Sequence, residues 1–330
     1  MRRVKPFHGF IGQRQLVKCL TSWADGSQAQ GKPLPHLLFA GPTGFGKTKL
    51  AQALAAYLGT DCSVLHGKCS PAKLCASLAN LRKGDILLID ECHALPESTQ
   101  ELLYTVLDDK GWVEDHLGAN APNAKRTAEQ KLMVEPITLI LATNKVNKLE
   151  AALKRRPILV MFNDYTLREL IAIVKQEATR EKILFTAQAA RLVAEVSHGR
   201  PYQVKKHLQQ MSLMSYDASQ EIRRMSEDDV RRYLRKSGIG TDGLDSKQWD
   251  YLAFLADQGC VSLTTVAMRI GLDPATTREW IEYPLVYMRL VSIDRAGRRL
   301  TDRGERYVKE RREQQARKIA ITAKETAHEN

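Results

Sequence analysis

Two features are missing from this 330-residue sequence, namely long apolar runs and paired cysteine motifs. No stretch approaches the roughly 18 consecutive apolar residues that a membrane-spanning helix needs. The opening residues 1–6 are basic and lack the apolar core of a signal peptide. We therefore expect a cytoplasmic protein that does not enter a membrane.

The six cysteines include no C-x-x-C pair. Cys62, Cys69 and Cys75 lie near His66, but their spacing is irregular and does not match that of zinc ligands. We expect reduced, partly buried thiols of the kind found in cytosolic proteins.

Acidic residues are also scarce relative to basic ones. The chain has 38 Asp and Glu against 50 Lys and Arg, a formal net charge of +12. Such a balance favours a polyanionic partner, and no basic amphipathic helix of the membrane-binding type stands out. Nucleic acid is therefore the expected partner, with a merely soluble basic surface as the alternative.

A glycine-rich loop organises the first part of the chain. The apolar segment 36–40 has strand length, and residues 49–58, beginning with Lys49, are rich in Ala and Leu as in a helix. Between them stands the G-x-x-x-x-G-K-[ST] motif of a P-loop: Gly41, Pro42, Thr43, Gly44, Phe45, Gly46, Lys47 and Thr48. Its backbone N–H groups would surround a phosphate, Lys47 would reach the β- and γ-phosphates, and the Thr48 hydroxyl would ligate Mg²⁺. We expect a nucleoside triphosphate to bind here.

Two carboxylates stand at the C-terminal end of an apolar strand that begins at residue 85. Asp90 and Glu91 form a Walker B pattern, in which Asp90 holds the Mg²⁺ shell and Glu91 polarises the attacking water. A carboxylate pair that only caps a strand is the alternative, and the upstream P-loop favours catalysis. The string Asp-Glu-Cys-His, ending at His93, also resembles a box of superfamily-two helicases, although no second RecA-like half is present.

Three further features lie before the end of this domain. Residues 109–135 form a hairpin or long loop that would touch DNA or a partner protein, or simply be solvated. Asn144 is the polar end of the strand 137–144, where it would lie between the Walker motifs and orient the water. Arg155 and Arg156 precede the strand 158–162, which suits an arginine that enters a neighbouring subunit's site.

The periodicity then becomes helical. Residues 166–236 read as four helices of a small all-helical domain, followed by a linker at 237–243. Helices at 246–258, 263–270 and 273–288, then a ribbon at 290–301, make a winged-helix pattern. Arg295, Arg298 and Arg299 on the wing would contact DNA. The charged tail from residue 302 reads as a helix that is solvated or frames nucleic acid.

From about Phe7 to Val308 the chain resembles the RuvB family, hexameric AAA+ motors that drive Holliday-junction branch migration. The resemblance rests on the residues 11–13, both Walker motifs, the hairpin and the order of three domains. It implies an α/β P-loop NTPase with a doubly wound parallel sheet, an all-helical lid and a C-terminal winged helix. The expected boundaries are 1–163 for the ATPase domain, 164–240 for the lid, 241–308 for the winged helix and 309–330 for the tail.

The resemblance also implies site residues, cofactors and partners. Ile11 would border the nucleotide, Asn144 falls at the sensor-one position, and Arg156 aligns best with the arginine finger, with Arg155 as the alternative. The lid reads Gly-Arg-Pro-Tyr where the family usually has Gly-x-Pro-Arg, so Arg200 and Tyr202 occupy the sensor-two motif. Lys205 and Lys206 are further alternatives for sensing the γ-phosphate. ATP and Mg²⁺ are the implied cofactors, with a RuvA-like partner possible through the hairpin.

The expected function is that of an ATPase that works as a helicase in DNA recombination and repair. Hydrolysis between the subunits of a ring would move duplex DNA or drive branch migration. An ATP-dependent assembly switch or loader, which recruits a partner without processive movement, is the alternative. A winged-helix regulator with a degenerate ATPase is a third hypothesis, which the intact Lys47, Asp90 and Glu91 oppose.

Overall fold

The computed structural model describes residues 7–117, 124–214 and 223–328, and the middle of the predicted hairpin at 118–123 lies outside them. The chain divides into two compact units, residues 1–169 and 170–330. No helix in the described part is long and apolar enough to cross a membrane.

The first unit contains a five-stranded parallel sheet in the order β2-β3-β6-β1-β7. Its strands are β1 (Leu37–Ala40), β2 (Cys62–His66), β3 (Ile86–Asp90), β6 (Thr138–Thr143) and β7 (Ile158–Met161). The three central strands β3, β6 and β1 are buried almost throughout, as expected for a parallel sheet covered on both faces. β6 therefore lies between the strands that end in the two Walker motifs, as predicted for Asn144.

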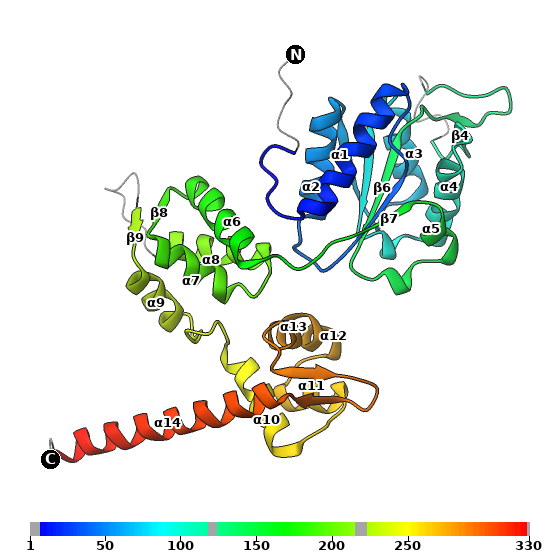
Figure 1. Ribbon diagram of the computed structural model, residues 1–330. Helices are drawn as coiled ribbons and strands as arrows, with labels where there is room; N and C mark the ends of the chain where they lie inside the picture. Colours follow the sequence, from blue (N-terminus) through cyan, green and yellow to red (C-terminus); the bar gives the residue numbers. More distant parts are fainter. Residues whose placement is uncertain (1–6, 118–123, 215–222, 329–330) are drawn as a thin grey trace. The chain divides into compact units, whose positions relative to one another are not determined.

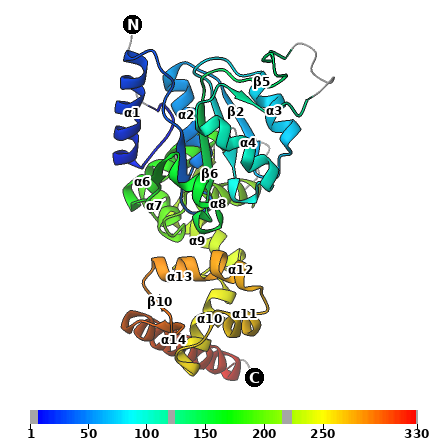
Figure 2. The same cartoon turned by 90° about the vertical axis from the view of Figure 1, so that its right-hand side faces the viewer.

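Helices cover both faces of this sheet (Figures 1 and 2). On one face lie α1 (Arg14–Ala29) and α2 (Lys47–Leu58), and on the other α3 (Pro71–Ala79), α4 (Glu97–Leu107) and α5 (Ala151–Arg155). Two short 3₁₀ turns follow strands, η1 (Cys92–Ala94) and η3 (Val146–Lys148). The predicted hairpin is present as the antiparallel pair β4 (Trp112–Val113) and β5 (Leu132–Met133).

The second unit begins with the lid. It contains α6 (Leu167–Arg180, which starts in the first unit), α7 (Ala187–Val196), α8 (Pro201–Met214) and α9 (Glu227–Lys236). The prediction of an all-helical lid was wrong in one respect, because β8 (Ile183–Phe185) and β9 (Arg223–Met225) pair in parallel. Segments of three residues are too short to show the alternation from which strands are predicted.

The winged-helix pattern is confirmed in the remainder of this unit. It comprises α10 (Ser246–Gln258), α11 (Leu263–Ile270), α12 (Pro274–Thr276), α13 (Tyr283–Tyr287), β10 (Val291–Ile293), β11 (Arg298–Leu300) and the tail helix α14 (Asp302–His328). The third helix, predicted as one piece, has a π-helical turn at Thr277–Glu282, labelled η4, between α12 and α13. A π-turn of this kind often marks a functional or strained site.

Candidate nucleotide-hydrolysis site

The P-loop connects β1 to the N-terminus of α2. Gly44 and Gly46 adopt φ angles of 83° and 86°, in the left-handed region that favours glycine. A Cβ at Gly41 would lie 2.8 Å from the Cβ of Phe162, so only glycine fits there. The buried Lys47 ammonium donates hydrogen bonds to the carbonyls of Gly41 (2.9 Å) and Pro42 (3.0 Å). The loop and its lysine thus form a compact cationic turn at a helix N-terminus.

The Walker B carboxylates lie at the same edge of the sheet. The Thr48 hydroxyl donates a 2.8 Å hydrogen bond to Asp90 Oδ2, and the Glu91 backbone N–H donates to Asp90 Oδ1 at 3.0 Å. Below them Cys92 is fully buried, and its burial raises the pKa of the thiol to about 12. The sequence therefore brings Thr48 and Asp90 together from segments 42 residues apart, as predicted.

These two side chains fit a bound Mg²⁺. A hydroxyl and a carboxylate are hard oxygen donors, and Mg²⁺ in phosphate-transfer sites is held by few protein oxygens plus substrate phosphates. No group of three or more His, Cys, Asp or Glu residues that could hold a metal occurs in the described residues.

β6 contributes polar groups between the Walker motifs. Asn144 donates from Nδ2 to the Thr43 hydroxyl at 2.8 Å, which joins the strand end to the P-loop. Its other amide atom, Oδ1, is buried and accepts no hydrogen bond from the part of the chain that the structure describes. Asn144 thus has an acceptor left for a ligand or water, which suits the predicted orienting role.

The segment before α1 packs behind the P-loop together with the chain that leaves β7. Gln13 forms two hydrogen bonds with the backbone of Asn163, through Nε2 (2.5 Å) and Oε1 (3.0 Å). The buried Tyr165 hydroxyl donates to the Phe45 carbonyl at 2.9 Å, and burial raises the pKa of this phenol. Ile11 is half-buried within this segment. The nucleotide contact predicted for Ile11 stays a prediction.

Arg155 and Arg156 are adjacent but have different environments. Arg156 Nε donates to Asp108 Oδ1 at 2.7 Å, and its guanidinium carbon lies 5.0 Å from the centre of the Tyr104 ring. This hydrogen bond raises the pKa of Arg156 and lowers that of Asp108. The exposed Arg155 side chain forms no hydrogen bond or ion pair with any described residue. Arg156 is thus held within its own subunit, whereas Arg155 is not.

The two sensor-two candidates lie at the start of α8. Arg200 is 7% exposed and donates to the Glu279 carbonyl at 2.9 Å, and its guanidinium lies 3.6 Å from the centre of the Tyr283 ring. Tyr202 is half exposed. Arg200 therefore joins the lid to the third helix of the winged-helix domain, and the nucleotide contacts predicted for Arg200 and Tyr202 stay predictions.

The three wing arginines also differ. Arg298 Nε donates to Glu282 at 2.9 Å, and the Tyr251 hydroxyl donates to the same Glu282 oxygen at 2.7 Å. Glu282 is 1% exposed, so Arg298 belongs to a buried ionic network. Arg299 is exposed and pairs with Asp294 at 2.5 Å, whereas Arg295 is exposed at the ribbon turn. Only Arg295 and Arg299 present their charge at the surface.

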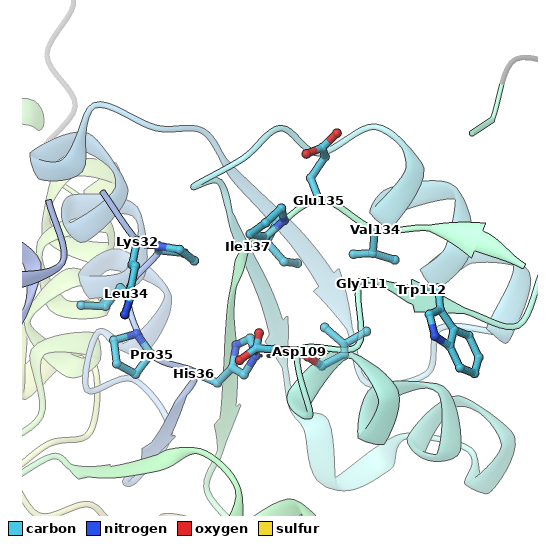
Figure 3. Close-up of a pocket in the computed structure, with 13 residues that line it drawn as sticks. Lys32, Leu34, Pro35, His36, Asp109, Gly111, Trp112, Val134, Glu135 and Ile137 are labelled. Atoms are coloured by element: carbon cyan, nitrogen blue, oxygen red, sulfur yellow. Dashed lines mark hydrogen bonds and ion pairs between the residues drawn. The ribbon is translucent and has the colours of Figure 1, made fainter. Parts of the chain in front are cut away.

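A separate cavity of about 400 Å³ lies at the opposite ends of β1 and β6, next to the base of the hairpin (Figure 3). His36 lines this cavity, and its ring is held against β6 because Nδ1 accepts a hydrogen bond from the Leu139 N–H at 2.9 Å. The Nε2 atom lies 3.2 Å from the Val106 carbonyl and 3.3 Å from an Asp109 oxygen, and burial lowers the pKa of His36. This cavity belongs to the hairpin base and not to the nucleotide site.

Sequence patterns did not single out Thr143 or Tyr165, and Gln13 was noticed only as part of the segment 11–13. Each acts through the backbone or through a side chain far away in the sequence, and no short motif reports such contacts. In the sequence, His93 stood out only as the last residue of the string Asp-Glu-Cys-His, with no role of its own.

Comparisons with known proteins agree with this geometry. The family description "Holliday junction DNA helicase RuvB P-loop domain" matches residues 2–161, and "RuvB C-terminal winged helix domain" matches residues 241–309. The Holliday junction branch migration complex subunit RuvB of Neorickettsia sennetsu is 30% identical over 313 residues, covering 93% of this chain and 92% of the relative. The corresponding subunit of Thermotoga petrophila is 29% identical over 317 residues, with 93% and 92% covered.

A solved structure leads to the same family. The Thermotoga maritima RuvB Holliday junction branch migration motor superposes with a TM-score of 0.75 at 27% identity, covering 93% of this chain and 98% of that one. The P-loop, the paired Walker B carboxylates and the winged-helix domain occur here in the same order along the chain. This chain belongs to the RuvB family of P-loop ATPases.

Proposed function

We propose that this chain hydrolyses ATP as one subunit of a hexameric ring that moves duplex DNA or drives the branch migration of Holliday junctions. The observation that carries the proposal is the meeting of Lys47, Thr48, Asp90, Glu91 and Asn144 at one edge of the sheet. The winged-helix domain in the same chain supports work on DNA, as do the relatives named for branch migration.

In this proposal each residue has one role. Lys47 and the P-loop N–H groups bind the phosphates, while Thr48 and Asp90 hold Mg²⁺, which neutralises charge on the phosphate oxygens when bound. Glu91 accepts a proton from the attacking water as the water oxygen bonds to the γ-phosphorus and the bond to the ADP oxygen breaks. Asn144 orients that water through its amide.

Ring assembly would complete the site. Charge that develops on the γ-phosphate would be stabilised by Arg155 of a neighbouring subunit, because Arg155 is exposed whereas Asp108 holds Arg156. β7, directly after these arginines, is an edge strand with exposed apolar side chains: Ile158 at 40%, Leu159 at 50% and Met161 at 65%. An exposed apolar edge next to Arg155 supports a subunit interface there.

DNA would be held by the wing. Arg295 and Arg299 present exposed guanidinium groups suited to phosphate oxygens, while Arg298 supports the ribbon from within through Glu282. A RuvA-type protein would bind the hairpin, where Lys131 lies 3.9 Å above the centre of the Trp112 ring. The six cysteines are all free thiols, which supports the cytoplasm as the compartment.

The test compares ATPase rates without DNA, with linear duplex and with a four-way junction, with and without a RuvA-type protein. A motor is expected to turn over faster as protein concentration and DNA rise, because the site needs a neighbouring subunit. A flat, DNA-independent rate would contradict the proposal.

Glu91→Gln separates a motor from a loader. A motor with this substitution is expected to bind DNA and stall, without displacing strands from a junction. If the variant still assembles and recruits a partner, and the wild type moves no DNA, the chain is an assembly switch.

A further inference from the structure

His93 lies in the turn η1, next to Glu91, the proposed general base. Its Nδ1 atom is 3.1 Å from the Thr143 hydroxyl oxygen and 3.1 Å from Glu91 Oε2. The His93 side chain is 13% exposed and that of Thr143 is fully buried, so the ring has little freedom to rotate. The ring thus connects the catalytic carboxylate to the last residue of β6.

The neighbouring groups favour a hydrogen on the Nδ1 atom of the His93 ring. The Thr143 oxygen already accepts a hydrogen bond from the Lys145 N–H at 2.9 Å. An unprotonated Nδ1 would direct its lone pair at the carboxylate oxygen 3.1 Å away, which is repulsive. A hydrogen on Nδ1 would be donated to the Thr143 oxygen and would place its positive end beside the Glu91 carboxylate, 3.1 Å away.

The backbone of Glu91 is fixed independently of its side chain. It adopts a left-handed conformation with φ 54° and ψ 41°, its N–H donates to Asp90, and its carbonyl accepts from the Ala94 N–H at 2.9 Å. The carboxylate has fewer restraints. Oε2 is buried and has no well-aligned hydrogen bond from the described residues, and His93 Nδ1 lies beside it. His93 is thus placed to restrain the direction of the carboxylate.

We propose that His93 is a positioning residue, which holds the Glu91 carboxylate toward the attacking water through its Nδ1–H. It connects the base to the strand that carries Asn144, so that both groups that orient the water share one support. This inference rests on the proposed ATPase function. Misplacing a catalytic group by about 1 Å lowers a rate by roughly 100-fold, and loss of a supporting hydrogen bond lowers activity by roughly 10- to 100-fold.

The test uses three substitutions at one position. His93→Asn keeps an N–H near the place of Nδ1, His93→Gln moves the amide to the place of Nε2, and His93→Ala removes both. We expect kcat to stay within about threefold of the wild type for Asn and to fall roughly 10- to 100-fold for Gln and Ala. The KM for ATP is expected to stay unchanged in all three, because His93 does not contact the P-loop.

Equal losses for Asn and Ala would overturn the proposal, because the Nδ1 donor would then not matter. A faster DNA-independent rate in His93→Ala would also overturn it, since His93 would then restrain the base. Thermal melting of each variant identifies any that fails to fold.

A double-mutant cycle separates this inference from the proposed function. His93→Ala is expected to cause no further loss in a Glu91→Gln background, because both act through one carboxylate. An undiminished further loss would show that His93 acts elsewhere. If Glu91→Gln itself leaves the rate unchanged, the assignment of the general base fails, whatever His93 does.

Discussion

Replacing Arg155 is expected to abolish nearly all ATP hydrolysis in the assembled ring, whereas replacing Arg156 is not. Arg156 is bound to Asp108 and stacked over Tyr104 within its own subunit. Arg155 is exposed and forms no side-chain hydrogen bond or ion pair with any residue in the described ranges. An arginine without such partners can enter a neighbouring site without first breaking an ion pair.

The two effects differ in size. An arginine finger contributes roughly 10³- to 10⁵-fold to the rate in related NTPases. The Arg156–Asp108 pair is about one-third exposed on each side, and exposed pairs contribute at most about 1 kcal/mol to stability. Arg155→Ala is thus expected to lower kcat by at least about 1,000-fold with unchanged ATP affinity. Arg156→Ala is expected to lower mainly the melting temperature, by a few degrees.

Mixing variants tests whether Arg155 acts between subunits. Glu91→Gln subunits lack the base but supply Arg155, and Arg155→Ala subunits have the base but lack the finger. In an equal mixture about one interface in four contains both wild-type groups, so activity is expected to return. If the mixture stays inactive although rings form, or if Arg156→Ala shows the larger loss of kcat, the reasoning is refuted.

Three further predictions follow from the second unit. Arg200→Ala is expected to lower the free energy of unfolding by about 2–4 kcal/mol, because a buried cation–π contact and a hydrogen bond are lost. Its ATP affinity is expected to stay unchanged. Weaker ATP binding without destabilisation would instead support a sensor role for Arg200. Arg298→Ala is expected to lower the free energy of unfolding by about 3–5 kcal/mol, since it leaves Glu282 charged and buried. Arg295→Ala is expected to keep the melting temperature and to reduce the salt dependence of DNA binding by about one charge. Burial lowers the pKa of His207 to about 4 from an ordinary 6.5. As pH falls, the unfolded chain therefore protonates His207 before the folded chain does. The stability contributed by the neutral ring is complete above about pH 6.5 and is lost as pH falls toward 4, by about 3 kcal/mol. Urea unfolding at several pH values checks this, and a His207→Gln variant is expected to show a smaller loss.

The nucleotide site could be predicted because its chemistry is local. Lys47 and Thr48 lie within one loop, and the strands are predicted from buried apolar runs that each end in a polar residue. The meeting of Thr48 with Asp90 and the place of Asn144 then follow from the rule that parallel strands end at one edge of the sheet. The order of the three domains is also visible in short sequence patterns, and it identified the family.

Contacts between distant segments that no motif and no rule of sheet topology connects could not be predicted. Arg298 looked like a surface residue of the wing because nothing nearby in sequence shows that Glu282, sixteen positions earlier, is buried beneath it. Arg200 looked like a nucleotide ligand because its motif resembles the lid motif of the family, yet its partner lies 79 residues further on. A charged residue's role depends on its partner, and the partner is defined only by the fold.

The contacts that the positively charged lid residues already make determine where positive charge for the γ-phosphate can come from. Tyr202 is uncharged, Arg200 is bound to the third helix of the winged domain, and Lys206 lies 5.5 Å from the centre of the Trp280 ring. The two lid lysines that were candidates for this role, Lys205 and Lys206, are both exposed, and neither forms a hydrogen bond or ion pair with a described residue. If neither lysine contacts the nucleotide, the charge within one subunit comes from Lys47 and the bound metal ion, and we expect the largest further contribution from Arg155 of the neighbouring subunit. Because hydrolysis would otherwise lack that charge, this chain should depend on ring assembly more strongly than a relative whose lid supplies its own arginine.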